Sequence, residues 1–441
     1  MRVLFVTPPA KAHLFAQVPL AWALRGAGHE VLVASRPNFV DEIVRTGLAA
    51  APVGATFDPT GFVKESAADA RTDEADNPHP WRSWEGVLDI AEQRPERLTP
   101  EYMYGVQAAW ALVFQGVSSP SMVVDLVDLA RSWRPDLILW DPLVFAGPVA
   151  ARVCGASHAR LLSGLDLIGG LRQRYRGVLG ELPPEQRDDP LAEWLTAVLA
   201  DHGAEFDEEI LVGQWTVDPV PTAMRLPVDH HYVPVRHVPY NGQAALPGWL
   251  REPPRRRRVC LTLGLSFREV LGGDRISVAE LLEAVADLDI EVVATLDEKQ
   301  LAGTGELPPN VHAVDFVPLN ELLPSCRAIV HQGGFGTLQT AFAHGVPQVI
   351  LPVATSWDSL VWSRKVEERG AGLCVTDPIG LTVQRLRELL LRVLDEPSFA
   401  DAAERLRTEV VGTPAPAEVV PLLERMVAAH RRSRAGRVVG P

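Results

Sequence analysis

Short apolar runs alternate with helical patterns along this chain of 441 residues, and this rhythm constrains the fold more than any other feature. In the first half a helix is predicted from about Leu14 to Arg25, because glycines follow directly. The apolar runs of that half predict strands at residues 2–7, 30–35 and 136–141. Such alternation indicates βαβ units and a parallel sheet that helices cover on both faces.

The same alternation restarts in the second half of the chain. A helix is predicted at about 277–286. Further strands are predicted at residues 255–264, 291–296, 311–317, 328–331 and 348–352. We therefore predict an α/β fold with two Rossmann-like, doubly wound parallel-sheet domains.

Breaks in this rhythm predict the domain boundaries. The stretch before the second set of strands is rich in proline and glycine, which is typical of a linker. The predicted parts are an N-terminal domain at 1–234 with an irregular and helical insertion at 55–115, a linker at 235–254, a C-terminal domain at 255–415, a C-terminal helix at 416–430 that packs back on the N-terminal domain, and a tail at 431–441.

Charge and cysteine usage narrow the class of protein. A net charge of −14 argues against a nucleic-acid partner, since binding to phosphates needs a basic face. The 4 cysteines form no CxxC pair, so neither a zinc site nor a disulfide framework is predicted. The N-terminus lacks the pattern of a signal peptide, and no apolar segment of membrane-spanning length occurs. We expect a cytoplasmic protein without a membrane partner.

The stretch HQGGFGTLQTAFAHGVPQVILP, residues 331–352, is the most informative motif. It predicts a strand, a glycine-rich turn and a helix that ends at Gly345. The amino end of such a helix suits a phosphate, and Thr337 and His331 offer further donors for a diphosphate. The glycines serve equally well in a tight turn that needs them only for packing. Neither GxxxxGK[ST] nor an early GxGxxG is present, which argues against an ordinary NTPase or dehydrogenase.

This motif resembles the donor-binding signature of nucleotide-sugar glycosyltransferases of the GT-B fold. Segments from HLFAQVPLAWALRGAGHEV (13–31) to RRRVCLTLGLS (256–266) are similar to actinobacterial enzymes that attach dTDP-deoxyamino sugars to macrolides. The resemblance implies two domains that face each other across a cleft. It further implies inverting O-glycosyl transfer from a dTDP-deoxysugar to a polyketide hydroxyl, on a macrolide first and an anthracycline-like aglycone second. No metal and no cofactor are expected.

Two residues of the first domain are candidates for the chemistry. His13 follows the first strand and opens the first helix, where a side chain points toward ligands. A lone histidine is more often structural, but the resemblance implies that His13 is the base that activates the acceptor hydroxyl. Asp141, at the end of another strand, is the expected partner that orients the imidazole. Its alternative role is that of a helix-capping or loop carboxylate.

The resemblance also implies a set of donor-binding residues. Phe316 and the backbone of Val317 are expected to contact the pyrimidine of the nucleotide, although Phe316 fits the core of a strand equally well. Plant relatives have a glutamate for the ribose at the position of Gln339, and glutamine there favours thymidine. The full set is His331, Gly333, Gly334, Gly336, Thr337, Gln339, Asp358, Ser359, Phe316, Val317, Gly264 and Ser266.

Three segments depart from the family pattern or imitate another one. Gln332 stands where histidine is common in the antibiotic enzymes, and VATS (353–356) before Trp357 differs from them. The DLD triplet at 287–289 matches the metal-binding DxD of other glycosyltransferases. It falls between a predicted helix and strand, so we interpret it as solvated charge.

Aromatic residues in the predicted insertion are candidates for the acceptor side: Trp81, Trp84, Trp110 and Phe114. They predict an apolar pocket for a polyketide, with ordinary core or a docking face as alternatives. The resemblance implies an auxiliary partner similar to a cytochrome that lacks haem ligation, contacting 55–115, and a homodimer is also considered. Other functions left open are UDP-sugar transfer, a catalytically silent GT-B scaffold, and an epimerase.

Overall fold

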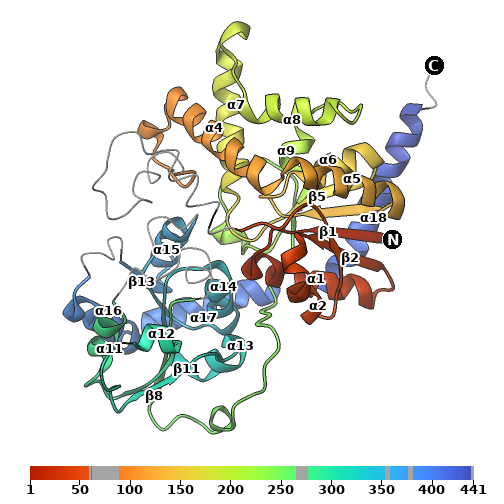
Figure 1. The fold of residues 1–441 in the computed structure, drawn as a ribbon. Helices are drawn as coiled ribbons and strands as arrows, with labels where there is room; N and C mark the ends of the chain where they lie inside the picture. The colour runs from red at the N-terminus through yellow and green to blue at the C-terminus, as the bar shows by residue number, and fades with distance from the viewer. Residues whose placement is uncertain are drawn as a thin grey trace. The chain divides into compact units, whose positions relative to one another are not determined.

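The computed structural model describes residues 1–58, 61, 89–264, 277–302, 304–352, 358–375 and 381–438. The chain forms two compact units, each built around its own sheet (Figure 1). Unit 1 contains Met1–Arg236 together with Pro414–Pro441, and unit 2 contains His237–Thr413.

The described part of unit 1 contains a parallel sheet of seven strands in the order β3-β2-β1-β4-β5-β6-β7. The central strands β1 and β4 are almost entirely buried, as expected for a sheet covered on both faces. The three predicted strands of this half are confirmed. The strands are β1 (Arg2–Val6), β2 (Glu30–Ser35), β3 (Ala49–Pro52), β4 (Leu137–Trp140), β5 (Ser157–Leu161), β6 (Trp215–Asp218) and β7 (Tyr232–Pro234).

Helices connect these strands and cover the sheet (Figure 1). The predicted first helix is confirmed, but it begins at Lys11 rather than at Leu14. His13 therefore lies in its first turn. The helices of unit 1 are α1 (Lys11–Gly26), α2 (Val40–Arg45), α4 (Pro100–Val117), α5 (Pro120–Trp133), α6 (Ala146–Cys154), α7 (Leu167–Glu181), α8 (Pro190–Ala200), α9 (Glu209–Val212) and α18 (Pro416–Val438).

Unit 2 repeats the architecture, with six parallel strands in the described residues in the order β10-β9-β8-β11-β12-β13. They are β8 (Arg257–Thr262), β9 (Ile290–Thr295), β10 (Val311–Val314), β11 (Cys326–His331), β12 (Gln348–Ile350) and β13 (Gly372–Cys374). Its helices are α11 (Val278–Val285), α12 (Glu298–Leu301), α13 (Leu319–Leu322), α14 (Phe335–His344), α15 (Ser359–Glu368), α16 (Val383–Asp395) and α17 (Pro397–Gly412). The prediction of two doubly wound sheets is confirmed.

Helix α16 shows why this sequence covers a sheet. It buries Leu386, Leu389, Leu390 and Val393, a spacing that places one apolar stripe on a single helix face. These side chains join the core cluster that contains the β8 and β9 residues of unit 2. The polar remainder of α16 faces solvent.

Helix α18 returns the end of the chain to unit 1, where it contacts α1 and β5. Val419 and Leu423 are buried, and Glu424 lies 3.0 Å from the Nε2 of His29. Arg431 pairs with Asp136. The helix continues to Val438, beyond residue 430 where the sequence-based assignment ended it, because no proline interrupts that stretch.

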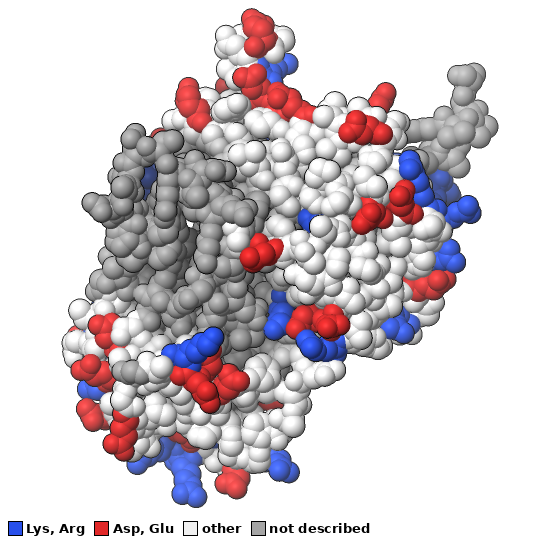
Figure 2. Space-filling model, viewed as in Figure 1, with Lys and Arg blue, Asp and Glu red and all other residues white. Residues whose placement is uncertain are grey.

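On the face shown in Figure 2, acidic side chains predominate along the upper edge, and elsewhere several acidic and basic side chains lie close together. Several form surface ion pairs, such as Arg45 with Glu42 at 2.6 Å. Among the described helices, none is long and apolar enough by itself to cross a membrane. The bent pair α4 and α5, which meet at 60°, passes that test only by length and composition.

Candidate active site

The carboxyl edge of the unit 1 sheet brings His13 and Asp141 together. Asp141 follows β4 directly, and its backbone N–H donates to the carbonyl of Val6 on the neighbouring strand β1 at 2.9 Å. His13 stands in the first turn of α1, which begins shortly after β1. The His13 Nδ1 and the Asp141 Oδ2 are 2.7 Å apart. Strand ends of this kind are where open α/β sheets bind their ligands.

This contact fixes which nitrogen of His13 carries the proton. A carboxylate only accepts hydrogen bonds, so Nδ1 donates to Asp141 and Nε2 is left as the basic atom. The Asp141 side chain is fully buried, whereas that of His13 is 27% exposed. A buried carboxylate behind a half-buried imidazole is the arrangement of a histidine base with an orienting partner.

Ser163 completes this cluster and was missed by the sequence analysis. Its Oγ donates to the Asp141 Oδ2 at 3.3 Å and lies 3.0 Å from the His13 Nδ1. The other carboxylate oxygen of Asp141 accepts from the N–H of Leu143 at 3.1 Å. Ser163 lies two residues after β5, and the structure shows that β5 pairs with β4. Strand-end positions on adjacent parallel strands share one sheet edge.

In unit 2 the predicted strand, turn and helix at residues 326–345 are confirmed. β11 ends at His331, α14 begins at Phe335, and Gly345 ends the helix with a left-handed φ of 63°. Gly333 has a φ of 82°, and a Cβ at that position would lie 3.1 Å from the Cβ of Ser359. Glycine is thus needed at 333 for both its conformation and its close packing.

The amino ends of two helices meet at this turn, since Ser359 is the first residue of α15. Gly334 and Gly336 are exposed and Thr337 is half-buried, so backbone of the first turn of α14 is accessible. Free N–H groups and the helix dipoles give both ends a positive potential. The geometry suits an anion at the turn.

His331, the residue predicted to contact the diphosphate, has its hydrogen-bond partners within unit 2. Its Nδ1 accepts from the N–H of Gly333 at 3.0 Å, so its proton is on Nε2, which donates to the Oε1 of Gln348 at 2.9 Å. The side chain is 1% exposed, and burial lowers its pKa to about 4. Both ring nitrogens are occupied inside unit 2. His331 therefore supports the turn and has no N–H to offer a phosphate oxygen.

The residues predicted to contact the donor sugar and those predicted to contact the nucleobase differ in how far they are buried. Asp358 precedes α15 and is 7% exposed, and its Oδ2 accepts from the indole N–H of Trp362 at 2.7 Å. Phe316 follows β10 and is 43% exposed, so the alternative of a strand-core residue is wrong. Val317 is buried, and Gln339 is fully buried.

The remaining donor-side predictions involve the end of β8. Gly264 has a φ of 74°, and its N–H donates to the Oγ1 of Thr262 at 3.3 Å. Ser266 and the VATS segment lie outside the described residues, as does Trp357.

The DLD triplet is surface charge, as interpreted from the sequence. The side chains of Asp287 and Asp289 are 89% and 87% exposed. Asp289 pairs with Arg256 at 3.2 Å. Among the described residues, no group of three or more His, Cys, Asp and Glu side chains is arranged to hold a metal ion.

Two of the predicted acceptor residues belong to the core of unit 1. Phe114 is 1% exposed and Trp110 is 9% exposed. The ring centroids of Phe114 and Phe145 are 4.8 Å apart, and those of Phe145 and Trp194 of α8 are 5.9 Å apart. The ordinary-core alternative thus holds for Phe114, because α4 packs this face against α8. Trp81 and Trp84 lie outside the described residues.

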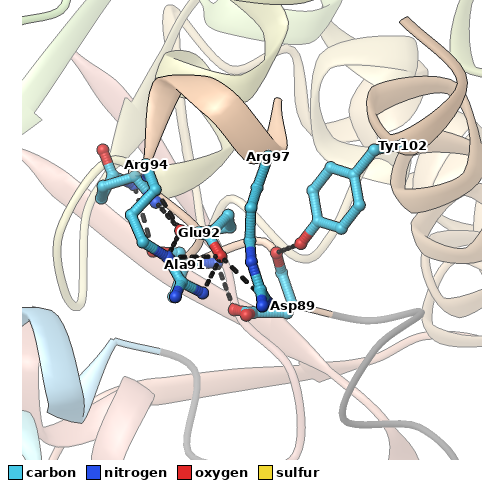
Figure 3. Close-up of polar contacts among 7 residues, drawn as sticks. Asp89, Ala91, Glu92, Arg94, Arg97 and Tyr102 are labelled. Atoms are coloured by element: carbon cyan, nitrogen blue, oxygen red, sulfur yellow. Dashed lines mark hydrogen bonds and ion pairs between the residues drawn. The ribbon is translucent and has the colours of Figure 1, made fainter. Parts of the chain in front are cut away.

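A charged cluster fixes the start of α4, within the predicted insertion (Figure 3). The buried carboxylate of Glu92 accepts from the side chain of Arg94 and from its backbone N–H, and it lies 3.9 Å from Arg97. The Arg94 hydrogen bonds lower the pKa of Glu92 to about 2. The Tyr102 hydroxyl donates to the carbonyl of Asp89 at 2.9 Å, and burial raises the pKa of Tyr102 to about 12. These bonds anchor the chain where α4 begins.

Comparison with known proteins identifies the family. Residues 22–264 match the erythromycin biosynthesis protein CIII-like N-terminal domain, and residues 279–426 match the C-terminal domain of the same family. The chain is 55% identical over 439 residues to the aclacinomycin-T 2-deoxy-L-fucose transferase of Streptomyces galilaeus, covering 99% of this chain and 98% of that protein. It is 49% identical over 433 residues to the 10-deoxymethynolide desosaminyltransferase of Streptomyces venezuelae, covering 98% of each.

Solved structures agree. The glycosyltransferase VinC in complex with dTDP superposes with a TM-score of 0.86 at 42% identity, covering 97% of this chain and 100% of that chain. The spinosyn forosaminyltransferase SpnP gives a TM-score of 0.80 at 42% identity, covering 97% and 99%. The predicted GT-B fold and the predicted resemblance are confirmed. The chain therefore belongs to the erythromycin biosynthesis protein CIII-like family and is a glycosyltransferase.

Proposed function

We propose that this enzyme transfers a deoxysugar or deoxyaminosugar from a dTDP-sugar to a hydroxyl of a polyketide aglycone, with inversion at the anomeric carbon and without a metal or other cofactor. The observation that carries the proposal is the His13–Asp141 pair at 2.7 Å, which leaves the Nε2 of a half-buried imidazole as a base. A single base and a single displacement produce inversion.

The acceptor hydroxyl must lose its proton while its oxygen attacks the anomeric carbon of the sugar. The Nε2 of His13 takes the proton of the acceptor hydroxyl as its oxygen bonds to the anomeric carbon. The imidazolium that forms is stabilised by the buried carboxylate of Asp141, which Ser163 and the N–H of Leu143 hold in place. Positioned general bases of this kind contribute roughly 10²–10⁴-fold to the rate.

The leaving nucleoside diphosphate gains negative charge as the glycosidic bond breaks. The amino ends of α14 and α15 and the accessible backbone at Gly334 and Gly336 are suited to stabilise that charge. Such electrostatic stabilisation supplies what a divalent cation supplies in metal-dependent transferases. This supports metal independence, as does the exposed, surface position of the DLD triplet.

The relatives support the substrate classes. VinC was crystallised with dTDP, which favours a dTDP-sugar donor. The two relatives named above transfer 2-deoxy-L-fucose to aclacinomycin T and desosamine to 10-deoxymethynolide. The higher of these two identities, 55%, is to the aclacinomycin enzyme, so both an anthracycline and a macrolide belong in the first acceptor screen.

The proposal also covers the cellular compartment of the protein and its protein partners. All four cysteines are free, which suits a reducing cytoplasm. We propose that an auxiliary protein related to a haem-less cytochrome docks on the 55–115 region, where Leu112 and Tyr104 of α4 are 66% and 43% exposed. Turnover with and without that partner tests its requirement, and sedimentation tests for a homodimer.

The decisive experiment measures transfer with purified protein, a dTDP-deoxysugar and a panel of macrolide and anthracycline aglycones. NMR of the product should show the anomeric configuration opposite to that of the donor, and EDTA should leave the rate unchanged. His13→Ala should abolish turnover but keep dTDP binding. If the protein is a catalytically silent scaffold, the wild type itself will show no turnover. Thermal stabilisation of the protein by UDP in place of dTDP would contradict the assigned nucleotide.

A further inference from the structure

Gln332 has a buried polar side chain that the proposed mechanism does not yet use. It lies between His331 and Gly333, in the turn from β11 to α14. The residue is 3% exposed, and neither its Nε2 nor its Oε1 has a hydrogen-bond partner among the described residues. Buried carboxamides are nearly always hydrogen-bonded, so this group requires an explanation.

The surroundings of Gln332 identify the kind of partner that would satisfy it. The side chain projects from a turn where the amino ends of two helices meet, and α14 has no side-chain cap at its N-cap residue, Gly334. His331 next to it is fully paired within unit 2, so it does not compete for the same ligand. A ligand rich in acceptors and negative charge is favoured by both helix dipoles and by the two hydrogens of the Gln332 Nε2.

We propose that the Gln332 carboxamide donates a hydrogen bond to the leaving diphosphate of the nucleotide sugar, the contact that the sequence had assigned to His331. This inference rests on the proposed function, because it names a residue of the same donor site. His331 acts indirectly, by holding the N–H of Gly333 and thereby the shape of the turn. The contact to the leaving group is then a neutral amide, which does not titrate in the physiological range.

The test is calorimetric titration of the full-length protein with dTDP and, in parallel, with thymidine, which lacks phosphates. Gln332→Ala should weaken dTDP binding about 10- to 100-fold, the effect of losing a hydrogen bond to a charged group. Thymidine binding should change by less than about twofold, since no phosphate is involved. Gln332→Glu should bind dTDP more weakly than Gln332→Ala, because like charges repel. Gln332→His should retain more affinity than Gln332→Ala.

Gln107→Ala is the matched control. Gln107 lies on α4 in unit 1, is 1% exposed, and also has both amide atoms without a partner among the described residues. Removing its side chain reproduces the loss of a buried glutamine without touching the turn at 332. Its dTDP affinity should equal that of the wild type, while thermal unfolding reports whether each variant is folded.

The outcomes separate this inference from the proposed function. If Gln332→Ala and Gln332→Leu bind dTDP like the wild type, the amide has another partner, such as water, and the inference is overturned while the proposed function stands. Equal losses for dTDP and thymidine would also overturn it, because they indicate general damage to the site. A wild-type protein that binds no dTDP overturns the proposed function itself.

Discussion

Replacing Asp141 by asparagine isolates the electrostatic part of catalysis, because asparagine keeps the shape of the side chain and removes its charge. Asp141 is fully buried, and its Oδ2 contacts the His13 Nδ1 at 2.7 Å. The attraction between this carboxylate and His13 becomes large only when His13 takes the proton of the acceptor. The loss should therefore appear mainly in kcat rather than in donor affinity.

The size of the effect follows from the contact. Two unit charges about 4 Å apart interact by about 4 kcal/mol at an effective dielectric constant of about 20. The partial exposure of His13 screens some of this, so about 3–4 kcal/mol is expected. Since each 1.36 kcal/mol changes a rate about tenfold, Asp141→Asn should lower kcat by roughly 10²–10³-fold.

The assay is steady-state transfer to the best aglycone, followed by chromatography and mass spectrometry, with dTDP affinity measured in parallel. The affinity of Asp141→Asn for dTDP should match that of the wild type. The double variant with His13→Ala should be no slower than His13→Ala alone, because residues that act as a unit are not additive. If folded Asp141→Asn keeps more than about a third of wild-type kcat, the orienting role of Asp141 is refuted.

Three further changes test other parts of the structure. Ser163→Ala removes one hydrogen bond to Asp141 and should reduce kcat about fivefold, while Ser163→Thr keeps the hydroxyl and most of the rate; equal rates for both would contradict the assignment. Gly333→Ala should lower the free energy of unfolding, measured with denaturant, by about 1–3 kcal/mol, because Gly333 has a φ of 82° and a Cβ there would press on Ser359. Gly336 has open space around it, so Gly336→Ala should be neutral or stabilising. Glu92→Gln should lower the free energy of unfolding at pH 7. Because the folded-state pKa of Glu92 is lowered to about 2, the difference from wild type should shrink as the pH falls from the ordinary Glu pKa of 4.5 toward 2. A difference that is constant with pH would argue against the Arg94 contact as its cause.

Periodicity and strand-end position predicted much of this protein from its sequence. The strands β1, β2, β4 and β8 to β12 follow apolar runs, whereas β3, β5, β6, β7 and β13 were not predicted. His13 and Asp141 were identified from their positions at strand ends together with the family resemblance, and the structure shows that the two strands are neighbours. Ser163 was missed for the converse reason. A serine in a loop carries no periodic signal, and its value depends on β5 pairing with β4, which a single sequence does not show.

The donor turn shows what the motif and the resemblance could not predict, which is the burial of a side chain. The motif and the resemblance predicted that His331 contacts the diphosphate. In the structure it is the last residue of β11, is enclosed by the sheet and is bonded to Gln348 on β12. Trp110 and Phe114 were likewise assigned to a pocket from their aromatic character. Their helical spacing of four residues equally describes the buried face of α4, and that face packs into the core.

The return of α18 to unit 1 affects the order in which the protein is made. Unit 2 is continuous in sequence, from His237 to Thr413, so it is complete as soon as those residues leave the ribosome. Unit 1 requires the helix that begins at Pro416, which is synthesised after unit 2. The nascent chain therefore carries an unfinished first unit while the second is folding, and it exposes the surface of α1 that Val419 and Leu423 will cover. Truncation before Pro414 should leave that exposure permanent and make the chain prone to aggregate.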